Sequence, residues 1–194
     1  HDYRGNTDAQ IEYSQASSRW QFPAPFYSHS EPIDAQHTAE FFYLDTTAML
    51  HALRWPALLR LFEADQLAWL EQALAKSTAT WKFVIGHHPV VSGGSHGDNS
   101  ALGEKLQPLF QRYGVAAYIC GHDHVLQHVT VDGVNYFVVG AGAETRKVRA
   151  IDGTQMARAS LGIMTARLAP DVMEASFIDA TGETLYRTTI TRPR

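Results

Sequence analysis

The sequence predicts an α/β protein, and three observations lead to that fold class. Residues 115–120 are short and continuously apolar, as in a strand that is buried on both faces of a sheet, and residues 81–85 form another short, mostly apolar run. Residues 65–76 place leucines and alanines at the spacing of an amphipathic helix. Farther along, Asp132-Gly133 joins two β-rich runs and predicts a hairpin. We therefore expect a mixed sheet or two packed sheets.

The other expected elements follow from the same patterns. Residues 1–36 are polar and broken by glycine and proline, so we expect an irregular segment with one short helix at 8–17. A buried strand is expected at 38–45, ending in a turn at 45–47. The later elements are a helix at 102–112, a hairpin of 126–131 with 134–139, a charged and mobile segment at 143–157, and an antiparallel meander of 161–169, 173–179 and 184–190.

Composition excludes several classes of protein. A length of 194 residues with 45% hydrophobic and 19% charged residues is that of an ordinary globular domain. The net charge of −4 and the lack of a long basic run argue against a protein that binds nucleic acid through its phosphates. No apolar stretch approaches the ~18 residues of a membrane span. The chain starts at His1 without a methionine, so we expect an upstream segment in the natural protein.

Histidines give the strongest chemical signal, and ten is a high number for this length. Both buried strands end in a glycine followed by histidine, in Gly-His-His-Pro at 86–89 and Gly-His-Asp-His at 121–124. In an extended chain residues i and i+2 point the same way, so His122 and His124 should converge on one site. With His87 they would supply three nitrogen ligands for zinc, iron or manganese at the carboxyl ends of strands.

Each of these residues also has a structural interpretation. One His-x-His motif is equally well explained by surface histidines in a turn, whereas a second motif favours a metal site. We expect His88 to point away from His87 and to act in packing or in support of a ligand. Asp123 would turn the loop or orient a ligand, and the single cysteine, Cys120, would be a core residue because burial raises the pKa of a thiol. The histidines expected in surface or loop positions are His29, His37, His51 and His128.

Three motifs occur in a specific order: Gly86-His-His-Pro89, Ser95-His-Gly97 and Gly121-His-Asp-His124. In this order and spacing they resemble the carboxyl half of a purple acid phosphatase of the small tartrate-resistant type, within the calcineurin-like metallophosphoesterases. The similarity runs from His1 to about Arg187. Other stretches that agree with it are Ala9–Ser14, Arg19–Pro23, Phe41–Thr46, Trp69–Glu71 and Gly140–Gly142.

The resemblance implies a fold and a set of roles. The fold would be a metallophosphoesterase-type β-sandwich flanked by helices, with two metal ions at strand ends, iron paired with iron, zinc or manganese. His87 and His122 would bind the divalent ion, and His124 the ferric or equivalent ion. His96, whose loop could otherwise be a simple flexible turn, matches a histidine that contacts phosphate and protonates the leaving group. His1 matches the second phosphate-facing histidine.

The family's remaining ligands, an Asn, two Asp and a Tyr, belong to an amino-terminal half. Asp45, Asp98 and Tyr118 do not stand in the matching motifs. We therefore expect residues 1–194 to be a single partial domain, completed by amino-terminal strands and ligands from an upstream segment or a second chain.

The predicted function is that of a metal-dependent acid phosphatase, which hydrolyses phosphomonoesters and is exported to the periplasm or the exterior. Two alternatives stay open. One is a phosphodiesterase or nucleotidase of the same fold, which would share every histidine named. The other is a non-catalytic metal-binding or interaction module.

Overall fold

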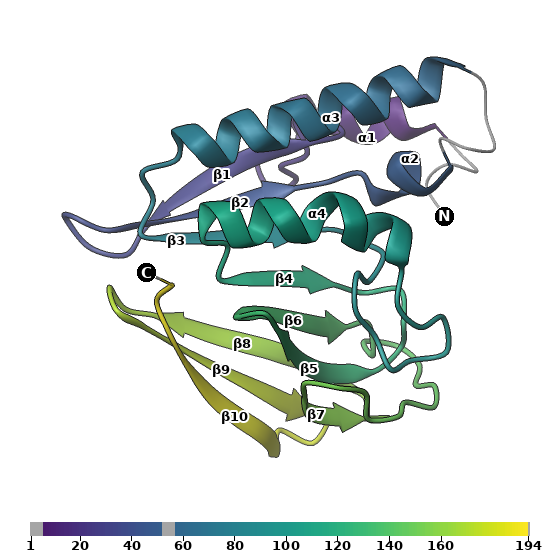
Figure 1. The fold of residues 1–194 in the computed structure, drawn as a ribbon, viewed down its shortest axis with the longest axis vertical. Coiled ribbons are helices and arrows are strands. Elements are labelled where there is room, and N and C mark those ends of the chain that lie inside the picture. The colour runs from purple at the N-terminus through teal and green to yellow at the C-terminus, as the bar shows by residue number, and fades with distance from the viewer. Residues whose placement is uncertain (1–5, 52–56, 194) are drawn as a thin grey trace.

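The computed structural model describes residues 6–51 and 57–193, so His1 lies outside the described residues. In the described part of the chain, helices between residues 46 and 113 pack on one face of a large sheet and a second sheet packs on its other face (Figure 1). The helices are α1 (Thr7–Ala16), α2 (Thr46–His51), α3 (Ala57–Lys76) and α4 (Ser100–Tyr113). The strands are β1 (Tyr27–Pro32), β2 (Thr38–Tyr43), β3 (Trp81–Ile85), β4 (Ala117–Cys120), β5 (Leu126–Val131), β6 (Val134–Val139), β7 (Thr154–Arg158), β8 (Gly162–Leu168), β9 (Val172–Asp179) and β10 (Thr184–Thr191).

The larger sheet has seven strands in the order β1-β2-β3-β4-β6-β5-β7. Its four central strands, β2, β3, β4 and β6, are parallel, whereas β1, β5 and β7 pair antiparallel. The smaller sheet has the order β10-β9-β8 and is antiparallel. This is the α/β architecture with two packed sheets that the sequence predicts.

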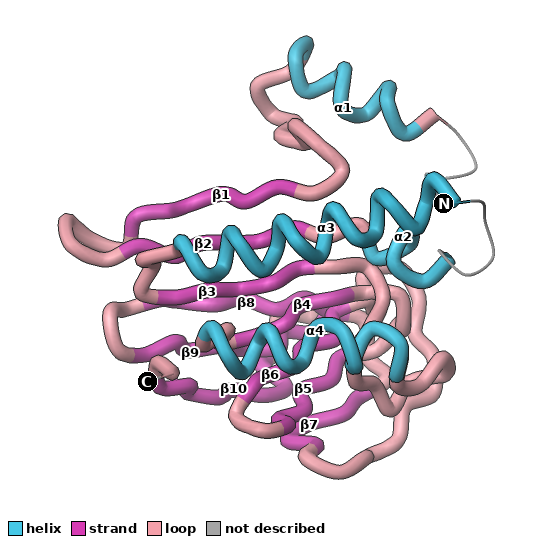
Figure 2. Tube along the Cα trace, turned by 45° about the horizontal axis from the view of Figure 1, so that its top comes forward, coloured by secondary structure: helices cyan, strands magenta, loops and turns pink. Residues whose placement is uncertain are grey.

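Two apolar cores lie on the two faces of the larger sheet. Alternate residues of its strands, such as Phe42 and Val84, pack under α3 and α4, which cross the same face of the sheet (Figure 2). Their sequence neighbours, such as Phe83, pack against the smaller sheet through residues such as Phe177. Because the central strands are largely buried on both faces, their sequences are mostly apolar, with polar exceptions such as Glu40 and Lys82.

Most expected elements are confirmed, including the helix near 8–17, the hairpin and the closing meander. Three were not predicted. β1 is an edge strand whose side chains are largely exposed, so it lacks an apolar pattern. α2 begins where a turn was expected. The Asp45 carboxylate accepts hydrogen bonds from the backbone N–H groups of Thr47 and Ala48 at 3.0 and 3.2 Å, as a helix cap does. β7 lies in the segment expected to be mobile, and it pairs with β5 instead.

No helix in the described ranges is long and apolar enough to cross a membrane.

Candidate metal centre

The candidate site lies where two neighbouring strands end. β3 and β4 are parallel and paired in register, so the loops that follow them leave the sheet at the same edge. Backbone hydrogen bonds then join the loops: Gly86 N–H donates to Ile119 C=O and Gly121 N–H donates to His87 C=O, both at 3.1 Å. The sequence therefore brings the Gly-His-His-Pro and Gly-His-Asp-His motifs side by side.

Gly86 and Tyr118 explain how the first loop crosses the second strand. A Cβ on Gly86 would lie 2.3 Å from the Tyr118 hydroxyl oxygen, a distance that real Cβ atoms do not adopt. The hydroxyl donates a hydrogen bond to His88 C=O at 2.7 Å. Tyr118 is fully buried and burial raises its pKa well above the usual range, so its hydroxyl stays protonated and supports the loop.

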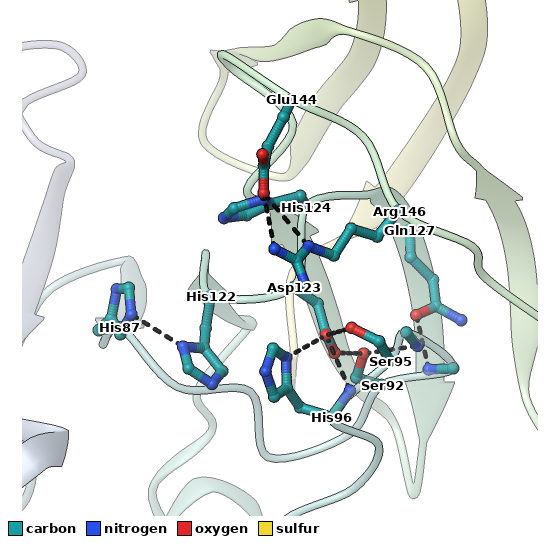
Figure 3. Close-up of polar contacts among 12 residues, drawn as sticks. His87, Ser92, Ser95, His96, His122, Asp123, His124, Gln127, Glu144 and Arg146 are labelled. Atoms are coloured by element: carbon teal, nitrogen blue, oxygen red, sulfur yellow. Dashed lines mark hydrogen bonds and ion pairs between the residues drawn. The ribbon is translucent and has the colours of Figure 1, made fainter.

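Three histidines come together at this edge. Among the described residues, His87, His88 and His122 form a group that could hold a metal ion, with ligand atoms within 4.8 Å of one another. His87 Nε2 lies 3.0 Å from His122 Nδ1 (Figure 3). His88 Nδ1 lies 2.9 Å from the Thr46 hydroxyl, which also accepts the His88 backbone N–H at 3.1 Å. The expectation that His88 points away from His87 is wrong, because this loop turns and its side chains do not alternate.

The Gly-His-Asp-His loop is not extended either. His122 has a positive φ of 63°, Asp123 N–H donates to Gly121 C=O at 2.8 Å, and Val125 N–H donates to Asp123 C=O at 2.9 Å. In this compact turn residues i and i+2 no longer point the same way. His122 faces His87, whereas His124 faces Glu144 (Figure 3). The expected extended geometry is therefore wrong, although both side chains stay at the same edge of the sheet.

Asp123 lies between the two histidines and is fully buried. Its carboxylate accepts hydrogen bonds from the Ser92 and Ser95 hydroxyls, from the His96 backbone N–H at 3.0 Å and from His96 Nδ1 at 2.7 Å. Burial alone would raise the pKa of Asp123, but the hydrogen bonds from Ser92 and His96 outweigh it and the pKa is lowered. Asp123 is therefore an ionised group that orders the loop carrying His96.

The hydrogen bond to Asp123 places the His96 ring beside the group formed by His87, His88 and His122. The centre of the His96 ring lies 4.1 Å from the ring centre of His122, and about half of the His96 side chain is exposed. Burial lowers the pKa of His122, and the neighbouring His96 and His87 lower it further. A lowered pKa favours neutral imidazole, the form that binds metal ions.

His124 makes a separate set of contacts. Its Nδ1 is hydrogen-bonded to Glu144 Oε1, and Arg146 binds the same carboxylate oxygen through its guanidinium at 3.0 Å. The hydrogen bond from Arg146, followed by that from His124, lowers the pKa of Glu144, so the carboxylate is ionised. Glu144 follows the stretch Gly140–Gly142 named in the resemblance, but nothing in the sequence signals its contact with His124.

The structure thus brings together His87, His122 and His96 of the predicted site residues. His124 lies on the same loop with its ring turned to Glu144, and His1 is outside the described residues. Thr46 and Ser92 join the site without having been predicted to do so, and His88, which was expected only in packing or in support of a ligand, is a member of the histidine group. Imidazole nitrogens in this number suit zinc, iron or manganese, so the residues present fit the metals implied by the sequence.

Comparison with known proteins agrees with the fold and with the motifs. The sequence model of the family described as calcineurin-like phosphoesterase matches residues 3–126. The chain belongs to this family. The calcineurin-like phosphoesterase chain is 37% identical to rabbit (Oryctolagus cuniculus) tartrate-resistant acid phosphatase type 5, over 97% of this chain and 64% of that protein. It is 32% identical to Arabidopsis thaliana purple acid phosphatase 17, over 96% of this chain and 60% of that protein.

The calcineurin-like phosphoesterase chain therefore spans less than two thirds of the length of these relatives, to which it is homologous. Among solved structures it is similar to GAP50, described as the anchor in the inner membrane complex of Plasmodium, with a TM-score of 0.88, 20% identity, and coverage of 99% of this chain and 64% of that one. It is also similar to purple acid phosphatase PPD1 of yellow lupin, with a TM-score of 0.71, 17% identity, and coverage of 91% and 35%. These likenesses show the metallophosphoesterase fold.

Proposed function

We propose that the protein hydrolyses phosphomonoesters at a dinuclear metal centre, and that residues 1–194 form part of its one catalytic domain. The observation that carries the proposal is the place of His96, which Asp123 holds with its ring 4.1 Å from that of His122. A group able to transfer a proton thus lies beside a group of nitrogens able to bind a metal ion. The acid phosphatases named among its relatives support this reaction.

His87 and His122 would hold one ion, since their Nε2 and Nδ1 atoms face each other. His124 would hold the second, together with ligands from outside the described residues. Such ions neutralise the phosphate and lower the pKa of a water that can attack phosphorus. Burial and the neighbouring histidines lower the pKa of His122, which favours the neutral imidazole that metal binding needs.

His96 would serve as the proton donor to the leaving oxygen. Its Nδ1 is bound to the ionised Asp123, which leaves Nε2 as the ring nitrogen that exchanges a proton with the substrate. Ser92 and Ser95 bind the same carboxylate and so fix the direction of the His96 ring. His1 is the second phosphate-facing group in this proposal, on the strength of the resemblance alone.

A comparison of two chromogenic substrates tests the reaction class. The chain as given and a version extended at its amino terminus to the full natural length would each be assayed on p-nitrophenyl phosphate and on its bis ester. We expect the extended version to cleave the monoester faster, and the chain as given to bind at most one ion weakly and to show little turnover. Faster cleavage of the diester would contradict the phosphomonoesterase, and an inert extended version would rule out the enzyme.

A further inference from the structure

The contacts of His124 differ from those of the other histidines at this edge. Its Nδ1 is hydrogen-bonded to Glu144 Oε1, and Arg146 donates to that same oxygen from its Nε at 3.2 Å and from its Nη2 at 3.0 Å (Figure 3). We propose that Glu144 and Arg146 are positioning residues, which fix the ring direction and the tautomer of His124 for metal binding. This inference rests on the proposed function, because it assigns a task within the same site.

Backbone contacts hold the segment that carries Glu144 next to the loop that carries His124. β6 ends at Val139, and a Cβ on the next residue, Gly140, would lie 2.2 Å from the Asp123 carbonyl oxygen, so only glycine allows the two loops to touch. The segment then returns to the Gly-His-Asp-His loop, and Arg146 N–H donates to His124 C=O at 2.9 Å. Glu144 lies between these two backbone contacts, so its backbone is held beside the loop that carries His124.

The chemistry of the pair fixes the tautomer. An ionised carboxylate has only acceptors, so the hydrogen between Glu144 and His124 belongs to Nδ1. The lone pair of neutral His124 is then on Nε2, which is the atom it presents to an ion. His122, two residues earlier, turns its Nδ1 toward His87 Nε2 instead. The two histidines of one motif therefore present different nitrogens, and Glu144 is the group that sets this difference.

The exposure of the Glu144 and Arg146 side chains indicates that they position His124 rather than stabilise the fold. The side chains of Glu144 and Arg146 are 53% and 52% exposed, and ion pairs in such positions contribute little to stability. Their removal should therefore leave the fold intact and change only the behaviour of His124. A carboxylate that orients a metal-binding histidine typically changes metal affinity or activity by roughly 10–100-fold when it is removed.

The direct test is nitrogen NMR of the His124 ring in the metal-free 194-residue chain, at a pH where His124 is neutral. We expect the Nδ1–H tautomer in the parent chain and a shift to Nε2–H, the form that free imidazole prefers in water, in Glu144→Ala. Glu144→Gln, which keeps an acceptor, should give an intermediate mixture. Glu174→Ala removes a comparably exposed carboxylate from β9 and should change nothing.

A second readout uses the protein at its full natural length, titrated with zinc or manganese by calorimetry. Glu144→Ala should weaken binding of one ion roughly 10–100-fold, with a smaller loss in Arg146→Gln and an unfolding temperature close to that of the parent. An unchanged His124 tautomer, or unchanged affinity for both ions, would overturn the proposal even in an active enzyme. The expected tautomer shift in a protein without turnover would support the positioning role and contradict the proposed function.

Discussion

The variant Asp123→Asn tests whether the Asp123 carboxylate orders the loop that carries His96 or whether that loop is simply a flexible turn. Asparagine keeps the shape of the side chain, removes its charge and replaces one acceptor oxygen with an NH2 group, so the variant weakens the hydrogen bonds that the carboxylate accepts. The carboxylate is fully buried and binds two serine hydroxyls and both the backbone and the ring of His96. A hydrogen bond to a charged group contributes about 1 kcal/mol more than a neutral one. The Ser92 contact is buried, whereas the His96 ring is half exposed and contributes less. We expect a total loss of about 2–4 kcal/mol in the free energy of unfolding at pH 7.

The assay is urea denaturation of the parent and of Asp123→Asn between pH 3 and pH 7, with the exposed Asp152→Asn as a matched control. The pKa of Asp123 is lowered in the fold, so its stabilising effect is present above the unfolded value of about 3.9 and is lost as the pH falls toward the folded value. The difference in the free energy of unfolding between the parent and the variant should therefore be largest at pH 7 and become smaller below about pH 4. Equal stability at pH 7, or a gap that stays the same at pH 3, would refute the reasoning.

Three further predictions concern single residues. The expectation that His128 is a surface or loop residue is wrong, because it lies buried in β5. Burial lowers the pKa of His128, so its stabilising effect should be complete above its unfolded pKa of about 6.5 and decline as the pH falls toward the folded value. In urea denaturation, His128→Phe should be less stable than the parent at pH 7.5, and the difference in the free energy of unfolding should narrow toward pH 5. Cys120 is buried, and its pKa is raised by burial and by Asp123, so a thiol reagent should label it only as fast as the protein unfolds. Gly140→Ala would force a Cβ to within 2.2 Å of the Asp123 carbonyl oxygen and should cost about 1–3 kcal/mol of stability, whereas Gly142→Ala meets nothing within 4 Å and should be nearly neutral in thermal unfolding.

The sequence predicts the buried elements of the fold well, because burial on both faces leaves a visible apolar run. Residues 81–85 are expected as a strand and form β3 with the same bounds. β1 has no such pattern, since five of its six residues are exposed, and only its pairing with β2 makes it a strand. β7 likewise depends on its partner, β5, and cannot be read from its own residues.

The site shows the same division. The two glycine-histidine motifs indicate which strand ends carry the chemistry, because a glycine after an apolar run marks where a strand stops. The sequence pattern does not reveal where the histidine side chains point, because their directions depend on the positive φ of His122 and on the turn that follows it. The roles of Asp123 and Glu144 depend on contacts across 27 and 20 residues of chain, which local spacing does not reveal.

The most direct test of the central claim is the metal content of His122→Ala in the protein at its full natural length, measured alongside turnover of p-nitrophenyl phosphate. His37→Ala, which removes a histidine paired with Asp34 away from the site, is the matched control. The account predicts that His122→Ala loses one ion per molecule and at least about 100-fold in turnover, in the range that metal and acid-base contributions supply, while His37→Ala keeps both. Full metal content and full turnover in His122→Ala would contradict the claim that the histidines at the ends of β3 and β4 form the metal centre.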